Sequence, residues 1–263
     1  AAGVVCWAKA GIGAVATQAM ALIDHGPLGI ELMGDGTKPQ EAMKRRLSLD
    51  KNPEIRQVAM IDSKSRISTH TGSDTIPESG HFVGDGFSCQ ANMMWKSTVW
   101  QSMHDQFLNT QGDIADRMLA ALNAAEHEGG DIRGMQSARI LVVSAEPNPN
   151  PWMETIVDIR VDDHPEPLTE IDRLLGLHRA YTSLDVESYD ESEICNEIPE
   201  IAFWRSIELA NMGRHEEAKE LSSFAILEHS GWKELLIRCA KSGLAGITDE
   251  TARILLDPHQ DDE

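Results

Sequence analysis

Positive charge is scarce in this sequence. Lys and Arg together number 23 against 43 Asp and Glu, which gives a formal net charge of −20 at pH 7 over 263 residues. No run of basic residues offsets this excess. Because binding to a phosphate backbone depends on Lys and Arg contacts, the composition argues against a nucleic-acid partner.

Cysteine motifs and long hydrophobic runs are also missing. The four cysteines lie far apart and form no Cys-x-x-Cys motif, so the sequence indicates neither a disulfide framework nor a zinc site. We interpret them as mostly buried thiols of a reducing compartment and predict a cytoplasmic protein. No apolar run approaches the roughly 20 residues that span a bilayer, so we expect no membrane partner.

The residues that are present predict a globular α+β fold. Hydrophobic residues make up 41% and charged residues 25% of the chain, which is close to the average of globular proteins. Strand-like segments come first, two amphipathic helices follow, and further strands come after them. This segregated order is typical of a sheet-and-helix sandwich and not of alternating βαβ units. The clearest strand pattern is Val157, Ile159 and Val161, which alternate with charged residues.

Composition changes after a predicted helix at Leu168–Tyr181. The segment Asp185–Glu200 has seven acidic residues and no Lys or Arg, and the sequence beyond it has helical periodicity throughout. We therefore predict a sandwich domain over 1–184, an acidic linker over 185–200 and a small all-helical domain over 201–263.

Three local predictions concern the first half of the chain. We expect one strand over Val4–Ala10 and another over Phe82–Gln90, the latter with a bulge or a close backbone approach at its glycines. We also expect Thr37 and Gln40 to form a capping box at the start of a helix over Pro39–Leu49, because they have the required spacing.

The segment Gly129–Ser137 carries the strongest functional signal. Its Gly-Gly pair follows a predicted helix, suits a left-handed helix end and leaves backbone N–H groups accessible. Asp131, Arg133, Gln136 and Ser137 add acceptors and donors within a few residues. The alternative is a tight helix-to-strand turn whose polar groups bond to one another.

Several motifs together resemble one family. They include Ala10–Gln18, Arg56-Gln57-Val58 with Asp62, Thr71-Gly72, Gln90-Ala91-Asn92-Met93, Gly129–Ser137 and Arg160–His164. In this order, from Ala1 to about His178, they resemble family ten-twenty-eight of the domains of unknown function, some of whose members are labelled fimbrial assembly proteins. The resemblance implies an Ntn-hydrolase-like fold, a four-layer αββα sandwich. One departure is Ala91, where the family usually has glycine.

The same resemblance implies a nucleophile at the head of the mature chain. In Ntn hydrolases that residue is Thr, Ser or Cys, and its own α-amino group acts as the base. Ala1 has no such side chain and aligns inside the family pattern. We therefore expect that on the order of two dozen residues, including the first strand and the nucleophile, lie upstream.

The helical segment at the C-terminal end resembles a small domain that some members of the family carry, which is described as peptidoglycan-binding. The resemblance rests on Phe203-Trp204, Gly213-Arg214, Glu217-Ala218 and Trp232–Leu235. It implies a glycan or peptidoglycan partner. Trp204 and Trp232 could stack on sugar rings, although their helical spacing is equally typical of core residues.

Asn92 and Asp131 are the candidate catalytic residues. Asn92 follows a predicted strand, where its amide could stabilise an oxyanion or could cap a turn. Asp131 and Arg133 could orient the amine and carboxylate of a substrate, or could form a structural ion pair.

The remaining candidates are substrate-binding residues. Thr17 and Gln18 end a predicted strand and could line the same pocket. We include Gln136 and Ser137 as well, with bonding to backbone groups at a strand entrance as the alternative. We interpret His70 and His81 as structural residues.

No cofactor and no metal is expected. Asp162-Asp163-His164 has the residue types of a divalent-ion site, but neighbouring residues of a strand point to opposite faces. Capping and ion pairing with Arg160 are therefore the preferred interpretations.

Two functional hypotheses follow. The first is an Ntn-type amidohydrolase acting on a small amide or amino-acid-like substrate. The second is a non-catalytic binding protein that keeps the same scaffold for a glycan, peptidoglycan or protein partner. We expect a homo-oligomer in either case.

Overall fold

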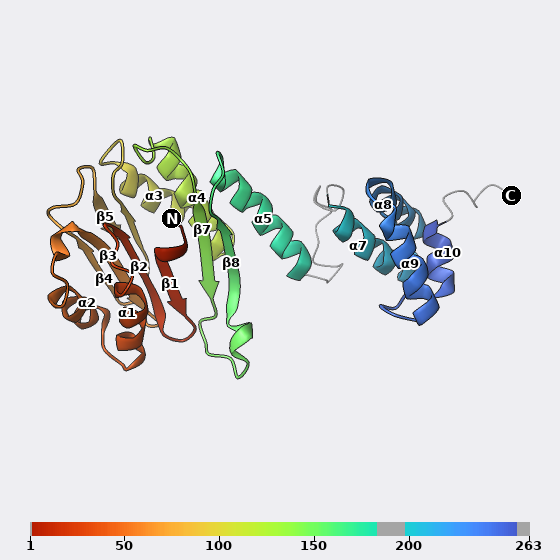
Figure 1. Cartoon of the computed structure of the whole chain (residues 1–263), viewed down its shortest axis with the longest axis horizontal. Helices are drawn as coiled ribbons and strands as arrows, with labels where there is room; N and C mark the ends of the chain where they lie inside the picture. The colour runs from red at the N-terminus through yellow and green to blue at the C-terminus, as the bar shows by residue number, and fades with distance from the viewer. Residues whose placement is uncertain (1, 183–197, 257–263) are drawn as a thin grey trace. The chain divides into compact units, whose positions relative to one another are not determined.

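The computed structural model describes residues 2–182 and 198–256. The chain divides into two compact units, Ala1–Leu174 and Leu175–Glu263 (Figure 1). The first unit combines strands and helices and the second is helical, which confirms the α+β prediction. Most of the predicted linker lies outside the described residues, and helix α7 begins at Pro199, near its end.

Four antiparallel strands form the first sheet of the first unit, in the order β1 (Cys6–Lys9), β2 (Gly13–Ala19), β3 (Arg56–Asp62) and β4 (Ile67–Thr71). Helices α1 (His25–Gly34) and α2 (Pro39–Ser48) cover one face of this sheet. The cross-strand pair Val15 and Met60 points into that helical layer and packs there against Met43. Because side chains alternate along a strand, Gln18 points to the opposite face.

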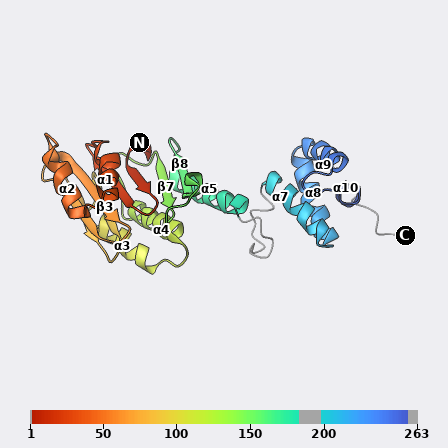
Figure 2. The same cartoon turned by 90° about the horizontal axis from the view of Figure 1, so that it is seen from below.

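The second layer of strands lies on that opposite face. It consists of the hairpin β5 (Gly80–Val83) and β6 (Ser88–Ala91), which contacts β3 and β4, and the pair β7 (Ala138–Val143) and β8 (Thr155–Val161), which contacts β1. Helices α3 (Val99–Asn109) and α4 (Ile114–His127) pack together on its outer side (Figure 2). The order of layers is therefore helix, sheet, sheet, helix.

The predicted alternation in the last strand is confirmed. Val157, Ile159 and Val161 of β8 are buried, and the residues between them are exposed. Helix α5 (Pro167–Thr182) follows β8, close to its predicted bounds. Short 3-10 turns at Ala2–Val4, Pro53–Ile55 and Pro151–Met153 complete the elements of this part.

Three local predictions were wrong in detail. The expected strand Val4–Ala10 is a 3-10 turn followed by the shorter β1. The expected strand Phe82–Gln90 is the β5–β6 hairpin, because Gly86 has a φ of +78° and Gly84 N–H donates to the Phe87 carbonyl at 2.9 Å. Thr37 forms no capping box.

Helix α2 begins after Lys38, with Pro39 in its first turn and without a side-chain cap. Proline needs no hydrogen-bond acceptor at that position, so the helix can start there without help from Thr37. The Gln40 amide instead donates to the Ile67 carbonyl of β4, at 2.6 Å. A true capping box occurs at Asp113 and Asp116, at the start of α4.

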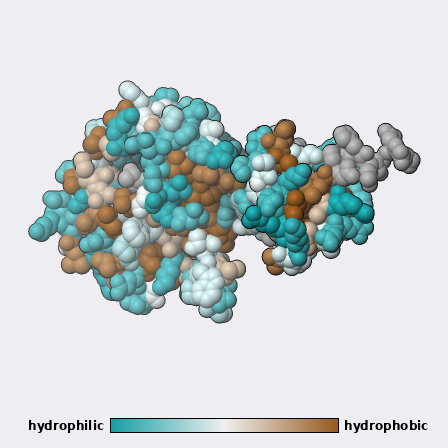
Figure 3. All heavy atoms as spheres, turned by 45° about the vertical axis from the view of Figure 1, so that its right-hand side comes forward, coloured by the Kyte–Doolittle hydropathy of each residue, from teal (hydrophilic) through white to brown (hydrophobic). Residues whose placement is uncertain are grey.

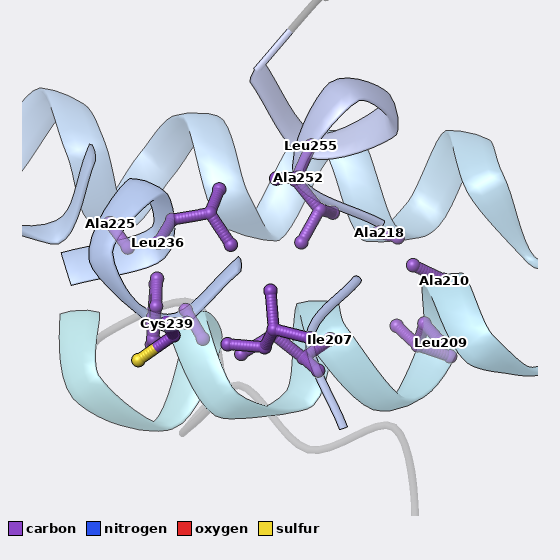
Figure 4. Close-up of a cluster of buried hydrophobic side chains, with 12 residues drawn as sticks. Ile207, Leu209, Ala210, Ala218, Ala225, Leu236, Cys239, Ala252 and Leu255 are labelled. Atoms are coloured by element: carbon purple, nitrogen blue, oxygen red, sulfur yellow. The ribbon is translucent and has the colours of Figure 1, made fainter. Parts of the chain in front are cut away.

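The second unit contains the helices α7 (Pro199–Asn211), α8 (His215–Glu228), α9 (Gly231–Ser242) and α10 (Asp249–Leu256). Their apolar faces meet in a core of small and aliphatic side chains that includes Ile207, Leu236 and Leu255 (Figure 4). Phe203 is fully buried in this core, and its ring lies 5.1 Å from the ring of Trp204 and 4.9 Å from that of Trp232. The two tryptophans thus pack on the core.

The surface in Figure 3 mixes hydrophilic side chains with smaller apolar patches. Exposed apolar residues are normal on globular proteins, and scattered ones do not indicate a binding surface. Among the described helices, none combines the length and the apolar character that a membrane crossing requires.

Candidate functional site

The candidate site is centred on three side-chain amides between the two layers of strands. Gln57 lies on β3 and is 1% exposed. Its Oε1 accepts hydrogen bonds from Gln18 Nε2 of β2 at 2.6 Å and from Asn92 Nδ2, which follows β6, at 3.2 Å. Gln18 and Gln57 are direct neighbours across β2 and β3, so the register of the sheet brings them together.

Gln57 also ties the two layers to each other. Its Nε2 donates to Thr71 Oγ1 of β4 and to the carbonyls of Gly80 and Ala91, each at 3.0 Å. Thr71 is the direct neighbour of Gln57 across β3 and β4. One buried amide therefore fixes both the β5–β6 hairpin and the position of Asn92.

The segment after Asn92 turns sharply and then pairs with the glycine loop. Met93 has a φ of +57°, which is unusual for a residue with a long side chain. Met94 and Asp131 form an antiparallel bridge, in which Ile132 N–H donates to the Met93 carbonyl at 2.9 Å. This short ladder brings the two candidate catalytic residues, Asn92 and Asp131, onto adjoining segments.

The glycines of the loop have the conformation that the sequence predicts. Gly130 has a φ of +66°, and its N–H donates to the Ala125 carbonyl at 2.9 Å, which closes the end of α4. A Cβ atom at Gly130 would lie 2.4 Å from Glu126 Oε2, so this position accepts no side chain without a shift of that carboxylate.

Asp131 and Arg133 form a bidentate ion pair. Asp131 Oδ1 accepts from Arg133 Nε at 2.9 Å, and Oδ2 accepts from Nη2 at 2.7 Å. Burial raises the pKa of Asp131, but the hydrogen bonds from Arg133 outweigh it and the pKa lies below its usual value. Burial and the Asp131 charge raise the pKa of the nearby Glu126. The side chain of Arg133 is 66% exposed.

The other predicted site residues lie apart from the amide cluster. Thr17 is fully buried on the helical face of β2, where its hydroxyl donates to the Leu22 carbonyl at 3.2 Å. It therefore points away from Gln18, since successive residues of a strand face opposite sides. Gln136 is exposed and its amide donates to Asp163 Oδ1 at 3.2 Å. Ser137, next to β7, is half-buried.

The three residues of the possible metal motif have separate protein partners. Asp162 pairs with Arg160 Nε at 3.0 Å, as expected, Asp163 accepts from Gln136, and His164 Nδ1 accepts from Glu166 N–H at 3.0 Å. Within residues 2–182 and 198–256, no group of three metal-ligating side chains comes together.

A buried ion-pair cluster holds the loop that follows Gln18. Asp50 Oδ2 lies 2.8 Å from Arg56 Nε and 3.0 Å from His25 Nε2, and Arg56 also donates to the Met20 carbonyl. The Arg56 hydrogen bond is the largest of the effects that hold the pKa of Asp50 far below its usual range. Burial lowers the pKa of His25, which is fully inaccessible to solvent.

The sequence model described as "Family of unknown function (DUF1028)" matches residues 1–171. The chain belongs to this DUF1028 family. The match covers every residue of the amide cluster and of the glycine loop, and it confirms the family resemblance that the motifs indicate.

A solved structure supports the same assignment. Protein SPO2555 from Silicibacter pomeroyi, a DUF1028 protein, resembles this chain with a TM-score of 0.60 and 27% sequence identity, over 67% of this chain and 77% of that one. A comparison with curated proteins gives no match.

The sequence analysis did not identify Gln57, the centre of the amide cluster, as a candidate residue. Gln57 and Thr71 were named only as parts of the family motifs. In the structure, Gln57 donates a hydrogen bond to Thr71 at the centre of the cluster. One signal was available: Gln57 is a lone amide directly before the apolar run Val58–Ile61. A buried polar group in a strand requires partners, so such a residue marks a polar contact between layers.

Proposed function

We propose that this DUF1028 protein is an Ntn-type amidohydrolase that acts on a small amide or amino-acid-like substrate. The observation that supports the proposal best is the short ladder between residues 93–95 and 130–132. It joins an amide donor, Asn92, to a carboxylate–guanidinium pair on a loop shaped by glycines. These groups are far apart in sequence and come from two different connecting segments, one after β6 and one after α4.

In this proposal Asn92 stabilises the oxyanion of the reaction. An amide nitrogen carries two hydrogens, and one of them is directed to Gln57 Oε1, so the other is available to a ligand. Because Gln57 is buried and multiply hydrogen-bonded, it holds the Asn92 amide in place before the substrate arrives. A preorganised donor of this kind contributes about 3 kcal/mol to transition-state stabilisation.

Arg133 supplies the substrate-binding charge. The ion pair with Asp131 uses Nε and Nη2 of the guanidinium. Since a guanidinium has five N–H donors, its outer edge can still bind a carboxylate or an amide oxygen. The bidentate contact with Asp131 keeps the guanidinium plane fixed on an otherwise exposed side chain.

The test is intact-mass analysis of the complete gene product before and after reaction with an electrophilic amide-mimic probe. We expect one probe mass on the first residue of the mature chain. Asn92→Ala should slow labelling by roughly a hundredfold, because an oxyanion donor is lost. Gln106→Ala, an exposed amide change on α3, is the matched control and should label at the normal rate.

A folded protein that takes up no probe would refute the hydrolase proposal. The second candidate, a non-catalytic binding protein, would then be preferred. The observation that favours it is that Asp131 already has both carboxylate oxygens bound by Arg133, as in a purely structural pair. Its test is sedimentation of the chain with purified peptidoglycan, with light scattering to measure the predicted homo-oligomer.

A further inference from the structure

A chain of hydrogen bonds links Asn92 to His81 through the middle of the first unit. Asn92 Nδ2 donates to Gln57 Oε1 at 3.2 Å, and Gln57 Nε2 donates to Thr71 Oγ1 at 3.0 Å. Thr71 Oγ1 in turn lies 2.8 Å from His81 Nδ1, on β5. The middle step is fixed by the register of β3 and β4, in which Gln57 and Thr71 are direct neighbours.

The surroundings of Gln57 determine the donor-to-acceptor direction of these hydrogen bonds. If the oxygen and nitrogen of its amide were exchanged, Oε1 would face the carbonyl oxygens of Gly80 and Ala91, and both hydrogen bonds would be lost. The Asn92 amide would then face another N–H donor. The donors therefore all point the same way, from Asn92 through Gln57 to Thr71.

The protonation state of His81 determines what Thr71 can do. Thr71 has one hydroxyl proton and accepts from Gln57, so it can donate to an unprotonated Nδ1 of His81. Burial, and to a lesser extent the charge of His70, lower the pKa of His81, which favours the neutral ring, and in the tautomer with its proton on Nε2 the Nδ1 atom accepts from Thr71. A proton on Nδ1 makes it a donor, so the Thr71 hydroxyl must turn its own proton away, and its oxygen then accepts from both His81 and Gln57.

Gln57 can respond when the Thr71 hydroxyl turns. Its amide nitrogen has two hydrogens but three acceptors at 3.0 Å, namely Thr71 Oγ1 and the carbonyls of Gly80 and Ala91. When the Thr71 hydroxyl turns to accept from protonated His81, the lone pair that faces Gln57 changes direction, and the hydrogen that Gln57 shares among its three acceptors can move toward the two carbonyls. Such a movement would rotate the amide and shift the Oε1 atom that accepts from Asn92.

We propose that Gln57 is a positioning residue that couples the protonation of His81 to the side-chain amide of Asn92, through Thr71. The effect on catalysis rests on the proposed oxyanion role of Asn92. The coupling itself does not, so it can be measured without a substrate.

Other titratable groups face β5 and must be separated from His81. His70 lies beside Thr71 on β4, and its Nε2 bonds to the Pro53 carbonyl at 2.9 Å. On α3, the ring of His104 lies 4.0 Å from that of Phe82. On β6, the residue opposite His81 is the uncharged Gln90.

The experiment is an NMR titration of the folded chain between about pH 5 and pH 8, where histidines titrate. We expect the side-chain amide signals of Asn92 and the ring signals of His81 to shift with the same midpoint. In Thr71→Val, which keeps the shape but removes the hydroxyl, His81 should still titrate while the Asn92 response is lost. Thr71→Ser should retain it.

Two further variants identify the source of the response. It should persist in His70→Gln and disappear in His81→Gln, and this pair decides the question if Thr71→Val does not fold. Asn92 signals that do not move in the unaltered chain would overturn the proposal. So would a response that survives in Thr71→Val, or one that follows the midpoint of His70 or His104.

Discussion

Replacement of Gln57 by leucine tests the central feature of the site. Leucine has a similar volume and is apolar, so the change removes the hydrogen bonds without opening a large cavity. Gln18 and Asn92 are partly exposed and can turn to water. The carbonyls of Gly80 and Ala91 each lose a donor, and the Ala91 residue is buried.

The expected loss follows from these two carbonyls. A buried polar group without its partner costs about 1–3 kcal/mol, so two carbonyls near the lower part of that range together destabilise the first unit by about 3 kcal/mol. A change of that size makes exchange through global unfolding roughly a hundredfold faster.

Native-state hydrogen exchange of the β3 amides is the appropriate assay, because it reports on the first unit separately from the helical unit. The matched control is Gln106→Leu, the same chemical change at an exposed position of α3, which should alter stability by at most about 0.5 kcal/mol. Equal exchange rates in the two variants would refute the view that Gln57 connects the layers.

Two further predictions concern the glycine loop and the buried histidine. Gly130→Ala should destabilise the protein by about 1 kcal/mol more than Gly134→Ala, as measured by urea unfolding. Both glycines have a positive φ, but only Gly130 lies against Glu126. An equal loss of stability in the two variants would show that the contact with Glu126 is unimportant. Burial lowers the pKa of His25, so the unfolded chain binds this proton more tightly and stability should fall as pH drops below about 6.5. Stability curves at neutral and mildly acidic pH should show this loss in the unaltered chain and a smaller one in His25→Gln; identical pH dependence would contradict the assignment.

Local patterns predicted the elements of this fold well where one face of an element is buried. The alternation of Val157, Ile159 and Val161 determines which side of β8 faces inward, whatever the strand pairs with. The helical stripes of α3 and α4 have the same property. The β5–β6 hairpin was missed although Asp85-Gly86 is a typical hairpin-turn pair, because the glycines of this segment were interpreted as a bulge within a single strand.

The site was less predictable because its contacts depend on the pairing of strands. The sequence motifs identified Asn92 and Asp131 as candidates. They could not show that the two segments adjoin, since this contact depends on the Met94–Asp131 bridge. It also treated Thr17 and Gln18 as neighbours in one pocket. On a strand they face different layers, and only Gln18 reaches Gln57.

Backbone strain is concentrated around the amide cluster, which supports a functional interpretation of it. Five non-glycine residues in the described part of the chain have positive φ, and three of them, Ala19, Glu78 and Met93, border this region. Ala19 follows Gln18 and Met93 follows Asn92, while the Glu78 carbonyl accepts from Met94 N–H at 3.1 Å. Each such conformation costs about 1–3 kcal/mol and persists only where surrounding contacts enforce it. Since both amides that meet Gln57 precede a strained residue, the fold holds them in fixed positions at a cost in stability, as expected for groups that must be in place before a ligand binds.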